Sequence, residues 1–219
     1  MKTALIFGSS GLIGSELLKL IINNDKYSKI RLFVRSEISI STSKIEIIKT
    51  DFNNLENHKD LIIGDDCFFC IGTTRKNTPD KNEYINIEYN LPIEIAKIAK
   101  KNSIHSFTYV SSLGANTNAS GLYLKNKGQA EETLKKLNFP KLSIIRPSIL
   151  LGNRNEKRIG EKIGIFVMKI FSPIFLGKMK KLKPIKVENV AKAMVNVTNK
   201  DFQQTIFESD KLLEISNLK

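Results

Sequence analysis

The sequence lacks the long apolar segments of membrane-spanning and secreted proteins. No uninterrupted apolar run reaches about 18 residues, so a membrane-spanning helix is not expected. The first apolar run is short and ends in Gly8-Ser9-Ser10-Gly11, which does not fit a secretory signal. Internal repeats and low-complexity linkers are also absent from the 219 residues, a length that fits one α/β domain with an appendage.

Cysteine is scarce, since Cys67 and Cys70 are the only two. Both lie in one apolar, strand-like run, three positions apart, and such positions face opposite sides of a strand. A mutual disulfide or a shared metal site is therefore not expected, and we predict no metal. Reduced, buried cysteines are typical of a cytoplasmic protein, which is the predicted location.

Acidic residues are few, with 22 Asp and Glu against 35 Lys and Arg, for a net charge of +13. Such a balance can indicate a nucleic-acid-binding protein. However, 29 of the 35 cations are lysines scattered along the whole chain, with one local cluster at 178–183. This scatter favours compositional drift over a basic binding face, so nucleic acid is not predicted as a primary partner.

The chain alternates short apolar runs with segments of helical spacing. The apolar runs lie at 3–8, 30–34, 45–48, 67–71, 107–110 and 142–150, and the clearest helical segments at 11–23, 83–101 and 123–137. Continuous apolar strands separated by helices are typical of a parallel sheet buried on both faces. We therefore predict an α/β fold, a doubly wound parallel sheet (Rossmann fold) of about six strands, over residues 1–152.

A glycine-rich segment joins the first apolar run to the first helical segment, and it reads Gly8-Ser9-Ser10-Gly11-Leu12-Ile13-Gly14. In a dinucleotide fingerprint the first glycine allows a tight turn, the second lets the backbone approach a pyrophosphate, and the third lets the helix pack closely on the strand. Free N–H groups at the helix start then face the phosphates. All seven residues are cofactor-binding candidates, although a plain tight turn would fit the glycines alone.

Ligands of doubly wound sheets bind at the carboxyl ends of the strands, so the residues after each strand are informative. Arg35 follows the second strand, where an NAD-preferring protein usually carries Asp or Glu. A guanidinium there can hold a 2′-phosphate through two hydrogen bonds, which favours NADP(H) over NAD(H). The alternative is a solvated arginine at a strand end.

Further cofactor-binding candidates follow the third, fourth and sixth strands. Asp51-Phe52 suits an adenine contact, although an Asp that opens a turn or caps a helix fits as well. Ile71-Gly72-Thr73-Thr74 combines a glycine, which allows close backbone approach, with hydroxyl donors. Pro147 marks the end of strand pairing, because it cannot donate a ladder hydrogen bond.

Catalytic candidates follow the fifth strand, where Ser111-Ser112 precede a helical segment that carries Tyr123 and Lys127. The tyrosine and the lysine lie four positions apart and so share a helix face. A lysine ammonium stabilises a phenolate and lowers the pKa of the phenol from about 10 towards neutrality, and a serine hydroxyl can hold a carbonyl oxygen. A surface tyrosine beside a lysine is the alternative, but the position after the fifth strand strengthens the catalytic interpretation.

Together these motifs resemble the short-chain dehydrogenase/reductase superfamily in its atypical or extended branch, and most of all the small NADPH-binding reductases related to the HIV Tat-interacting protein. The resemblance spans residues 3–152 and weakens towards the C-terminus, and its motifs lie at 8–14, 70–75, 111–115, 123–131 and 146–151. It implies that Tyr123 is the proton donor, Lys127 the partner of ribose and phenolate, and Ser112 the holder of the substrate carbonyl; Tyr123 and Lys127 are also cofactor-binding candidates. Ser111, also a cofactor-binding candidate, is the alternative holder, because the register of the strand end decides between them.

The resemblance implies an NADPH-dependent oxidoreductase that reduces the carbonyl of a small molecule by hydride transfer. A monomer or homodimer is predicted, and the sequence does not decide between them. Leu113-Gly114-Ala115 stands where sugar-nucleotide epimerases carry Val-Tyr-Gly, which makes a nucleotide-sugar substrate less expected. The alternative function is a non-catalytic NADPH-binding redox sensor or regulatory protein. The intact Ser–Tyr–Lys set favours the enzyme.

The strand–helix alternation stops after Gly152. In the superfamily the following segment forms a small helical lid, so 153–219 is predicted as a lid or substrate segment that completes the same single domain. The apolar residues of 157–171 would then line the pocket, although a core-packing helix fits as well. A basic amphipathic helix in weak contact with an anionic membrane surface is a third interpretation. Residues 185–194 are predicted as a strand that leads into a helix packed on the core.

Overall fold

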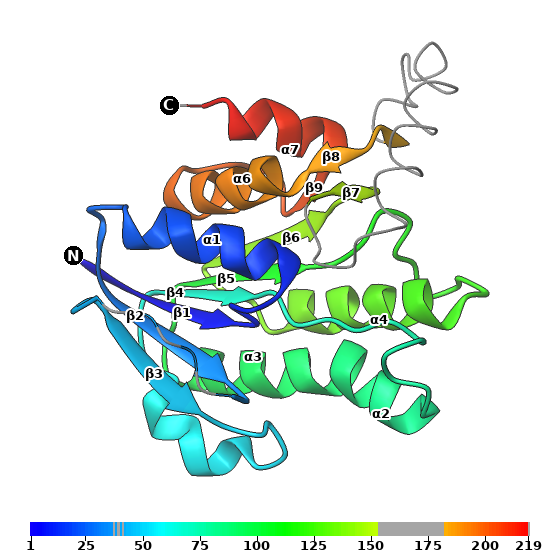
Figure 1. Ribbon diagram of the computed structural model, residues 1–219. Coiled ribbons are helices and arrows are strands. Elements are labelled where there is room, and N and C mark those ends of the chain that lie inside the picture. Colours follow the sequence, from blue (N-terminus) through cyan, green and yellow to red (C-terminus); the bar gives the residue numbers. More distant parts are fainter. Residues whose placement is uncertain (37, 39, 41, 153–181, 219) are drawn as a thin grey trace.

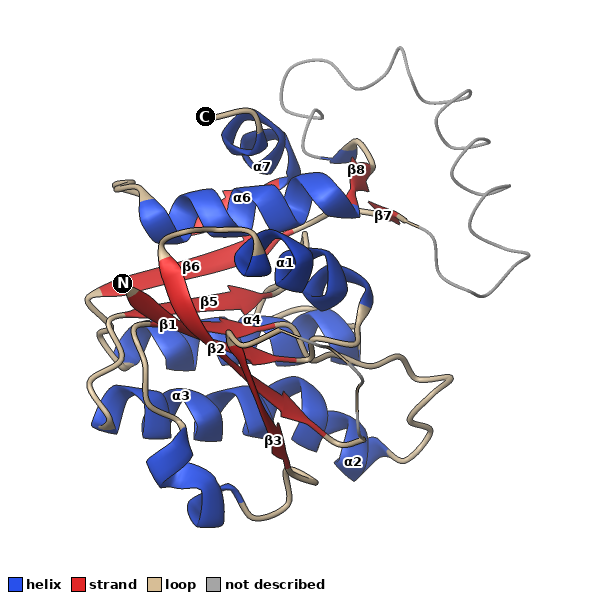
Figure 2. Cartoon of the chain, turned by 60° about the vertical axis from the view of Figure 1, so that its left-hand side comes forward, coloured by secondary structure: helices blue, strands red, loops and turns tan. Residues whose placement is uncertain are grey.

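The computed structural model describes residues 1–36, 38, 40, 42–152 and 182–218. A parallel seven-stranded sheet lies between two layers of helices (Figures 1 and 2). This confirms the predicted doubly wound α/β fold. The strands are β1 (Lys2–Phe7), β2 (Tyr27–Val34), β3 (Ile45–Lys49), β4 (Asp66–Phe69), β5 (Ser106–Val110), β6 (Lys141–Arg146) and β9 (Ile206–Glu208), in the order β3-β2-β1-β4-β5-β6-β9.

Six of these strands correspond to the six predicted runs, and two details differ. The last run, 142–150, does not continue through Pro147, because proline ends the ladder; β7 (Leu150–Leu151) pairs instead with β8 (Ile185–Lys186) in a separate small sheet beside α6 (Figure 2). The seventh strand, β9, was not predicted. It has only three residues and is recognisable chiefly by its pairing with β6.

Helices cover both faces of the sheet (Figure 1). On one face lie α1 (Leu12–Ile22), α6 (Val187–Asn199) and α7 (Ser209–Ser216), and on the other lie α2 (Lys81–Ile85), α3 (Leu91–Lys101) and α4 (Leu122–Lys136). The predicted helix at 83–101 is interrupted by one π-helical turn, η2 (Asn86–Asn90), between α2 and α3. A short 3₁₀ helix, η1 (Leu55–Leu61), follows β3.

The two hydrophobic cores follow from the alternation of side chains along each strand. In β1, Ala4 and Ile6 pack with α1 and α6, whereas Leu5 and Phe7 pack with α3, and all four are fully buried. Burial on both faces explains why the strands are continuous apolar runs rather than alternating ones. The cysteines obey the same rule: Cys67 belongs to the α3 side, Cys70 packs on the α1 side, and both are free thiols.

The strand order creates the crevice that a ligand of this fold uses. The chain builds β2 and β3 on one side of β1 and then crosses over to build β4, β5 and β6 on the other. The carboxyl ends of β1 and β4 are therefore the topological switch point, where ligands of open α/β sheets bind. Here the Cys70 N–H donates to the Phe7 carbonyl at 2.8 Å, which holds the loop after β4 against the turn after β1.

The C-terminal region completes the core. As predicted for 185–194, a short strand leads into a helix, and α6 packs with Val190 and Met194 buried against the α1 side of the sheet. The apolar segment 157–171 and most of the lysine cluster at 178–183 lie outside the described residues, so the lid stays a prediction. Within the part of the chain that the structure describes, no helix is long and apolar enough to cross a membrane.

Candidate functional site

The turn after β1 is built so tightly that two of its glycines leave no room for a side chain. Gly8 has φ +88°, and a Cβ there would lie 2.8 Å from the backbone N of Ile71. A Cβ on Gly14 would lie 2.1 Å from the Gly8 carbonyl oxygen, so α1 rests directly on the turn. Gly11 is the N-cap, and no side chain caps the helix. The first N–H groups of α1 therefore remain suited to an anion.

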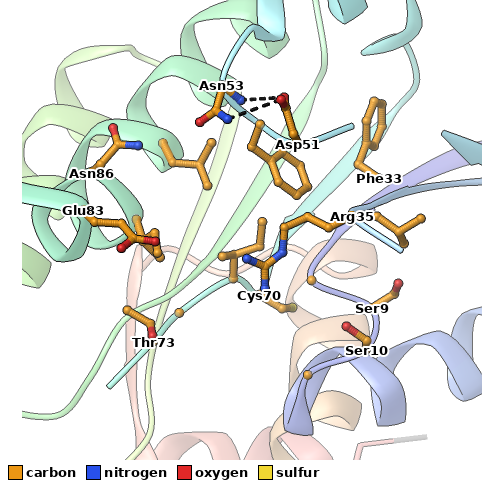
Figure 3. A pocket seen from close by; sticks show the side chains of 18 residues that line it. Ser9, Ser10, Phe33, Arg35, Asp51, Asn53, Cys70, Thr73, Glu83 and Asn86 are labelled. Carbon is orange, nitrogen blue, oxygen red and sulfur yellow. Dashed lines mark hydrogen bonds between the residues drawn. The ribbon is translucent and has the colours of Figure 1, made fainter. Parts of the chain in front are cut away.

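Beside this turn lies a cavity of about 290 Å³ (Figure 3). Ten predicted cofactor-binding residues line it, from the turn after β1 and the ends of β2, β3 and β4: Gly8, Ser9, Ser10, Gly11, Arg35, Asp51, Phe52, Ile71, Gly72 and Thr73. They meet because the carboxyl ends of parallel strands share one edge of the sheet. The buried Ser9 hydroxyl has no hydrogen-bond partner among the described residues, which leaves it available to a ligand.

Two of the lining segments have the features expected of an adenosine site. The exposed side chain of Arg35 extends into the cavity from the end of β2 (Figure 3). Asp51 accepts hydrogen bonds from the backbone and side-chain amide of Asn53, at 3.0 and 3.3 Å, and these bonds lower the pKa of its carboxyl. Phe52 has φ +65°, an uncommon conformation for a non-glycine residue, and it places the ring in the cavity wall.

Sequence reasoning missed part of the wall. Glu83, Asn86 and Ile87 line the cavity from α2 and η2. In Figure 3, Glu83 and Asn86 lie across the cavity from Ser9 and Ser10. The spacing of the three residues, i, i+3 and i+4, is that of one helix face, so the signal was present in the sequence. These residues lie on helical turns, whereas the cofactor-binding residues were predicted at strand ends.

The remaining predicted cofactor residues lie outside this lining. Ile13 is in the core, and Leu12 is half-buried at the start of α1. Gly14 packs directly against the backbone of the turn. The Thr74 carbonyl accepts from Asn77 and Thr78, and the Pro147 carbonyl accepts from the Leu113 N–H at 2.9 Å. These residues shape the backbone around the site.

Lys127 lies buried on α4, one helical turn after Tyr123. Its Nζ is 3.0 Å from Glu88 Oε2, donates to the Val110 carbonyl at 3.0 Å, and lies 4.8 Å from the centre of the Tyr109 ring. Burial opposes the charge, but the Glu88 carboxylate at 3.0 Å offsets it at neutral pH, and the pKa of Lys127 is raised. Lys127 is therefore an ammonium at neutral pH. Tyr123 is 39% exposed and open to a substrate.

The two serines after β5 differ in their surroundings. The Ser111 hydroxyl is buried and donates to Glu131, which also holds Arg146 through two hydrogen bonds. Ser112 is half-buried, and among the described residues its hydroxyl makes only one hydrogen bond, a long one of 3.4 Å to the Leu113 carbonyl. Of the two, Ser112 thus has the hydroxyl more available to a substrate, while Ser111 belongs to a buried polar network.

Comparisons with known proteins agree with this geometry. A family described as NAD(P)H-binding matches residues 8–201. The chain is 33% identical to Protein FMP52-1, mitochondrial, of Scheffersomyces stipitis over 211 residues, 92% of this chain and 90% of the relative. It is 32% identical to Protein HTATIP2 of Rattus norvegicus over 164 residues, 73% of this chain and 67% of the relative.

Two solved structures share the fold. The Bordetella bronchiseptica enzyme WbmH in complex with NAD+ superposes with a TM-score of 0.71 at 15% identity, over 95% of this chain and 75% of that one. The Helicobacter pylori ADP-L-glycero-D-manno-heptose-6-epimerase gives 0.70 at 17% identity, over 94% and 76%. At this identity they show the Rossmann-like fold alone.

The predicted cytoplasmic location is wrong on these comparisons. The relatives from Scheffersomyces stipitis, Debaryomyces hansenii and Eremothecium gossypii are all named mitochondrial. The prediction rested on two reduced, buried cysteines. Free thiols separate reducing from oxidising compartments, and they do not distinguish one reducing compartment from another.

Proposed function

The chain belongs to the NAD(P)H-binding family and is homologous to HTATIP2 and FMP52, as its motifs predicted, and on this basis we propose that it is an NADPH-dependent oxidoreductase that reduces a small carbonyl compound. The observation that carries the proposal is the buried Lys127 ammonium one helical turn from the exposed Tyr123, next to the end of β5 and its two serines. A protein that only binds the cofactor could use the lysine for the ribose, but it would not need the exposed phenol beside it.

The residues present fit a dinucleotide. A Cβ at Gly8 or Gly14 would collide with backbone, which keeps the turn close enough to meet a pyrophosphate, and the unpartnered Ser9 hydroxyl adds a donor. Arg35, Asp51 and Phe52 would hold the adenosine end. When bound, the reduced nicotinamide supplies a hydride.

The chain's own residues would manage the proton and the substrate oxygen. The Ser112 hydroxyl would donate to the carbonyl oxygen and orient it, and the Tyr123 phenol would give that oxygen its proton. The resulting phenolate is stabilised by the Lys127 ammonium, which lowers the cost of proton transfer at neutral pH. Ser111 is committed to Glu131 and supports the strand end.

Catalysis is tested by NADPH oxidation with a panel of small aldehydes and quinones. Tyr123→Phe should lower the rate about 10²- to 10⁴-fold, the usual effect of removing a positioned acid. NADPH affinity, measured by the fluorescence of the bound cofactor, should stay unchanged within error. Equal rates in both proteins would refute the catalytic role. NADPH binding without reduction of any carbonyl would favour the sensor or regulatory function instead.

We also propose that the cofactor is NADP(H) rather than NAD(H), because Arg35 stands at the end of β2 and points into the cavity. A charge-assisted hydrogen bond to phosphate contributes about 1.5–3 kcal/mol, so Arg35→Ala should weaken NADPH binding roughly 10- to 100-fold. NADH binding should change by less than about threefold, since NADH lacks the 2′-phosphate. Lys26→Ala, which removes an exposed cation before the amino end of β2, is the matched control. Equal losses for both cofactors would contradict the proposal.

A further inference from the structure

A fully buried carboxylate lies between the cofactor loop and the proposed catalytic lysine. Glu88 is 1% exposed, and its two oxygens have separate partners. Oε1 accepts the backbone N–H of Thr73 at 2.6 Å, and Oε2 lies 3.0 Å from Lys127 Nζ. A buried carboxylate is costly unless it is paired and hydrogen-bonded. Here Oε1 is hydrogen-bonded, and Oε2 is ion-paired but accepts no hydrogen bond among the described residues.

The backbone around Glu88 is adapted to this position. Glu88 lies in the π-helical turn η2, and such turns occur frequently at functional sites. Pro92 contributes to the irregularity, because it has no N–H to donate to the Glu88 carbonyl and so interrupts the α-helical ladder. The turn brings the carboxylate below Gly72, where a Cβ would lie 3.5 Å from Oε1. Asn86, two residues earlier, faces the cavity.

We infer that Glu88 is the counter-ion and positioning residue of Lys127, and that it joins the cofactor loop after β4 to the catalytic helix α4. This inference rests on the proposed function. One carboxylate oxygen holds the Thr73 amide, and with it the loop that lines the cofactor cavity. The other holds the ammonium beside the Val110 carbonyl, so that it stays in reach of Tyr123.

Glu88 is also the carboxylate that balances the Lys127 charge. The other titratable groups near Lys127 are Cys70 after β4, Tyr84 on α2, Tyr109 on β5 and Tyr123 on α4, and Arg75 lies over the Tyr84 ring. Burial raises the pKa of Cys70, Tyr84 and Tyr109 to about 12, so these groups are neutral at pH 7. Within the described residues, Glu88 is the carboxylate in ion-pair distance of the ammonium.

The charge of Glu88 therefore sets the pH range of activity. The Lys127 ammonium has to keep its proton in order to stabilise the phenolate that proton transfer leaves behind. Removing the carboxylate that lies 3.0 Å from this ammonium makes its proton easier to lose. In Glu88→Gln the alkaline limb of the rate profile should consequently move to lower pH, by at least about one unit.

The two contacts can be separated by three variants. Glu88→Gln removes the charge but keeps an oxygen for the Thr73 N–H, so NADPH affinity should stay within about threefold. Glu88→Met leaves that N–H without a partner and should weaken NADPH binding about tenfold. Glu94→Gln, on the exposed side of α3, is the matched control and should change neither property.

Three results would overturn the inference. One is an alkaline limb in Glu88→Gln that coincides with that of the wild type. Another is equal NADPH affinity in Glu88→Gln and Glu88→Met. The third concerns stability. The double variant Glu88→Gln/Lys127→Met should melt at a higher temperature than Glu88→Gln, or should fold where Glu88→Gln does not fold, because it leaves no charge buried alone. A double variant that shows no such recovery excludes the pairing. NADPH affinity and melting temperature are measured without a carbonyl substrate. These two measurements therefore test the role of Glu88 even if the wild-type protein reduces no carbonyl compound.

Discussion

Replacing Gly14 by alanine tests the glycine turn at its tightest point. The added Cβ would lie 2.1 Å from the Gly8 carbonyl oxygen and 2.8 Å from its carbon. Both atoms belong to the backbone, so neither can turn away as the end of a side chain would. To restore ordinary contact, the start of α1 and the turn have to move apart by about 1 Å.

This displacement should reduce both stability and cofactor binding. Overpacking of a tight core costs about 1–3 kcal/mol, and the free energy of unfolding should fall by that amount. The same movement takes the first N–H groups of α1 away from the pyrophosphate. We expect NADPH affinity to fall at least about tenfold, equivalent to 1.4 kcal/mol.

Urea unfolding followed by circular dichroism gives the stability, and NADPH fluorescence titration gives the affinity. Gly121→Ala is the matched control, because a Cβ at Gly121 meets no heavy atom within 4 Å and its φ of −80° suits alanine. That variant should stay within about 1 kcal/mol of the wild-type stability, because it adds no clash and only replaces glycine by the weaker N-cap alanine. If Gly14→Ala bound NADPH as tightly as Gly121→Ala, the turn would not be the pyrophosphate site.

Two further predictions concern the buried polar groups. Arg146→Met should lower the free energy of unfolding by about 3–5 kcal/mol, because it leaves the fully buried Glu131 carboxylate without its cation. A urea unfolding curve equal to that of the wild type would contradict this. The free energy of unfolding should also fall as pH rises above about 9. Burial raises the pKa of Cys70, Tyr84 and Tyr109 to about 12 in the folded state, so the unfolded chain loses these protons at lower pH than the folded protein does. Urea unfolding at pH 8 and pH 10 should differ by at least about 2 kcal/mol, and equal values would mean that these groups are not buried as described.

The fold class was predictable from the sequence because its determinants are local. Each strand is a continuous apolar run, and the helices have their own periodicity, so their alternation indicates a doubly wound sheet. The cavity was predictable for a related reason. Once the strands are parallel, Gly8, Arg35, Asp51 and Gly72 must come to one edge, since each follows the carboxyl end of its strand.

Other features depend on packing between distant segments. β9 is defined by pairing with β6, because three residues carry too little periodicity to be recognised. The difference between Ser111 and Ser112 follows from the direction of each side chain at the end of β5, and a shift of one residue would exchange them. A wrong location was predicted from the cysteines because thiol chemistry reports redox conditions only.

Sequence alone thus determined the sheet, the glycine turn, and the tyrosine and lysine four residues apart on one helix, because these are short-range patterns. Only the tertiary structure revealed Glu88 between Thr73 and Lys127. In the sequence Glu88 is one acidic residue within a helical segment, 15 positions after Thr73. Its buried position results from an irregular π-helical turn and from the packing of two other elements around it, and neither is encoded in a local pattern.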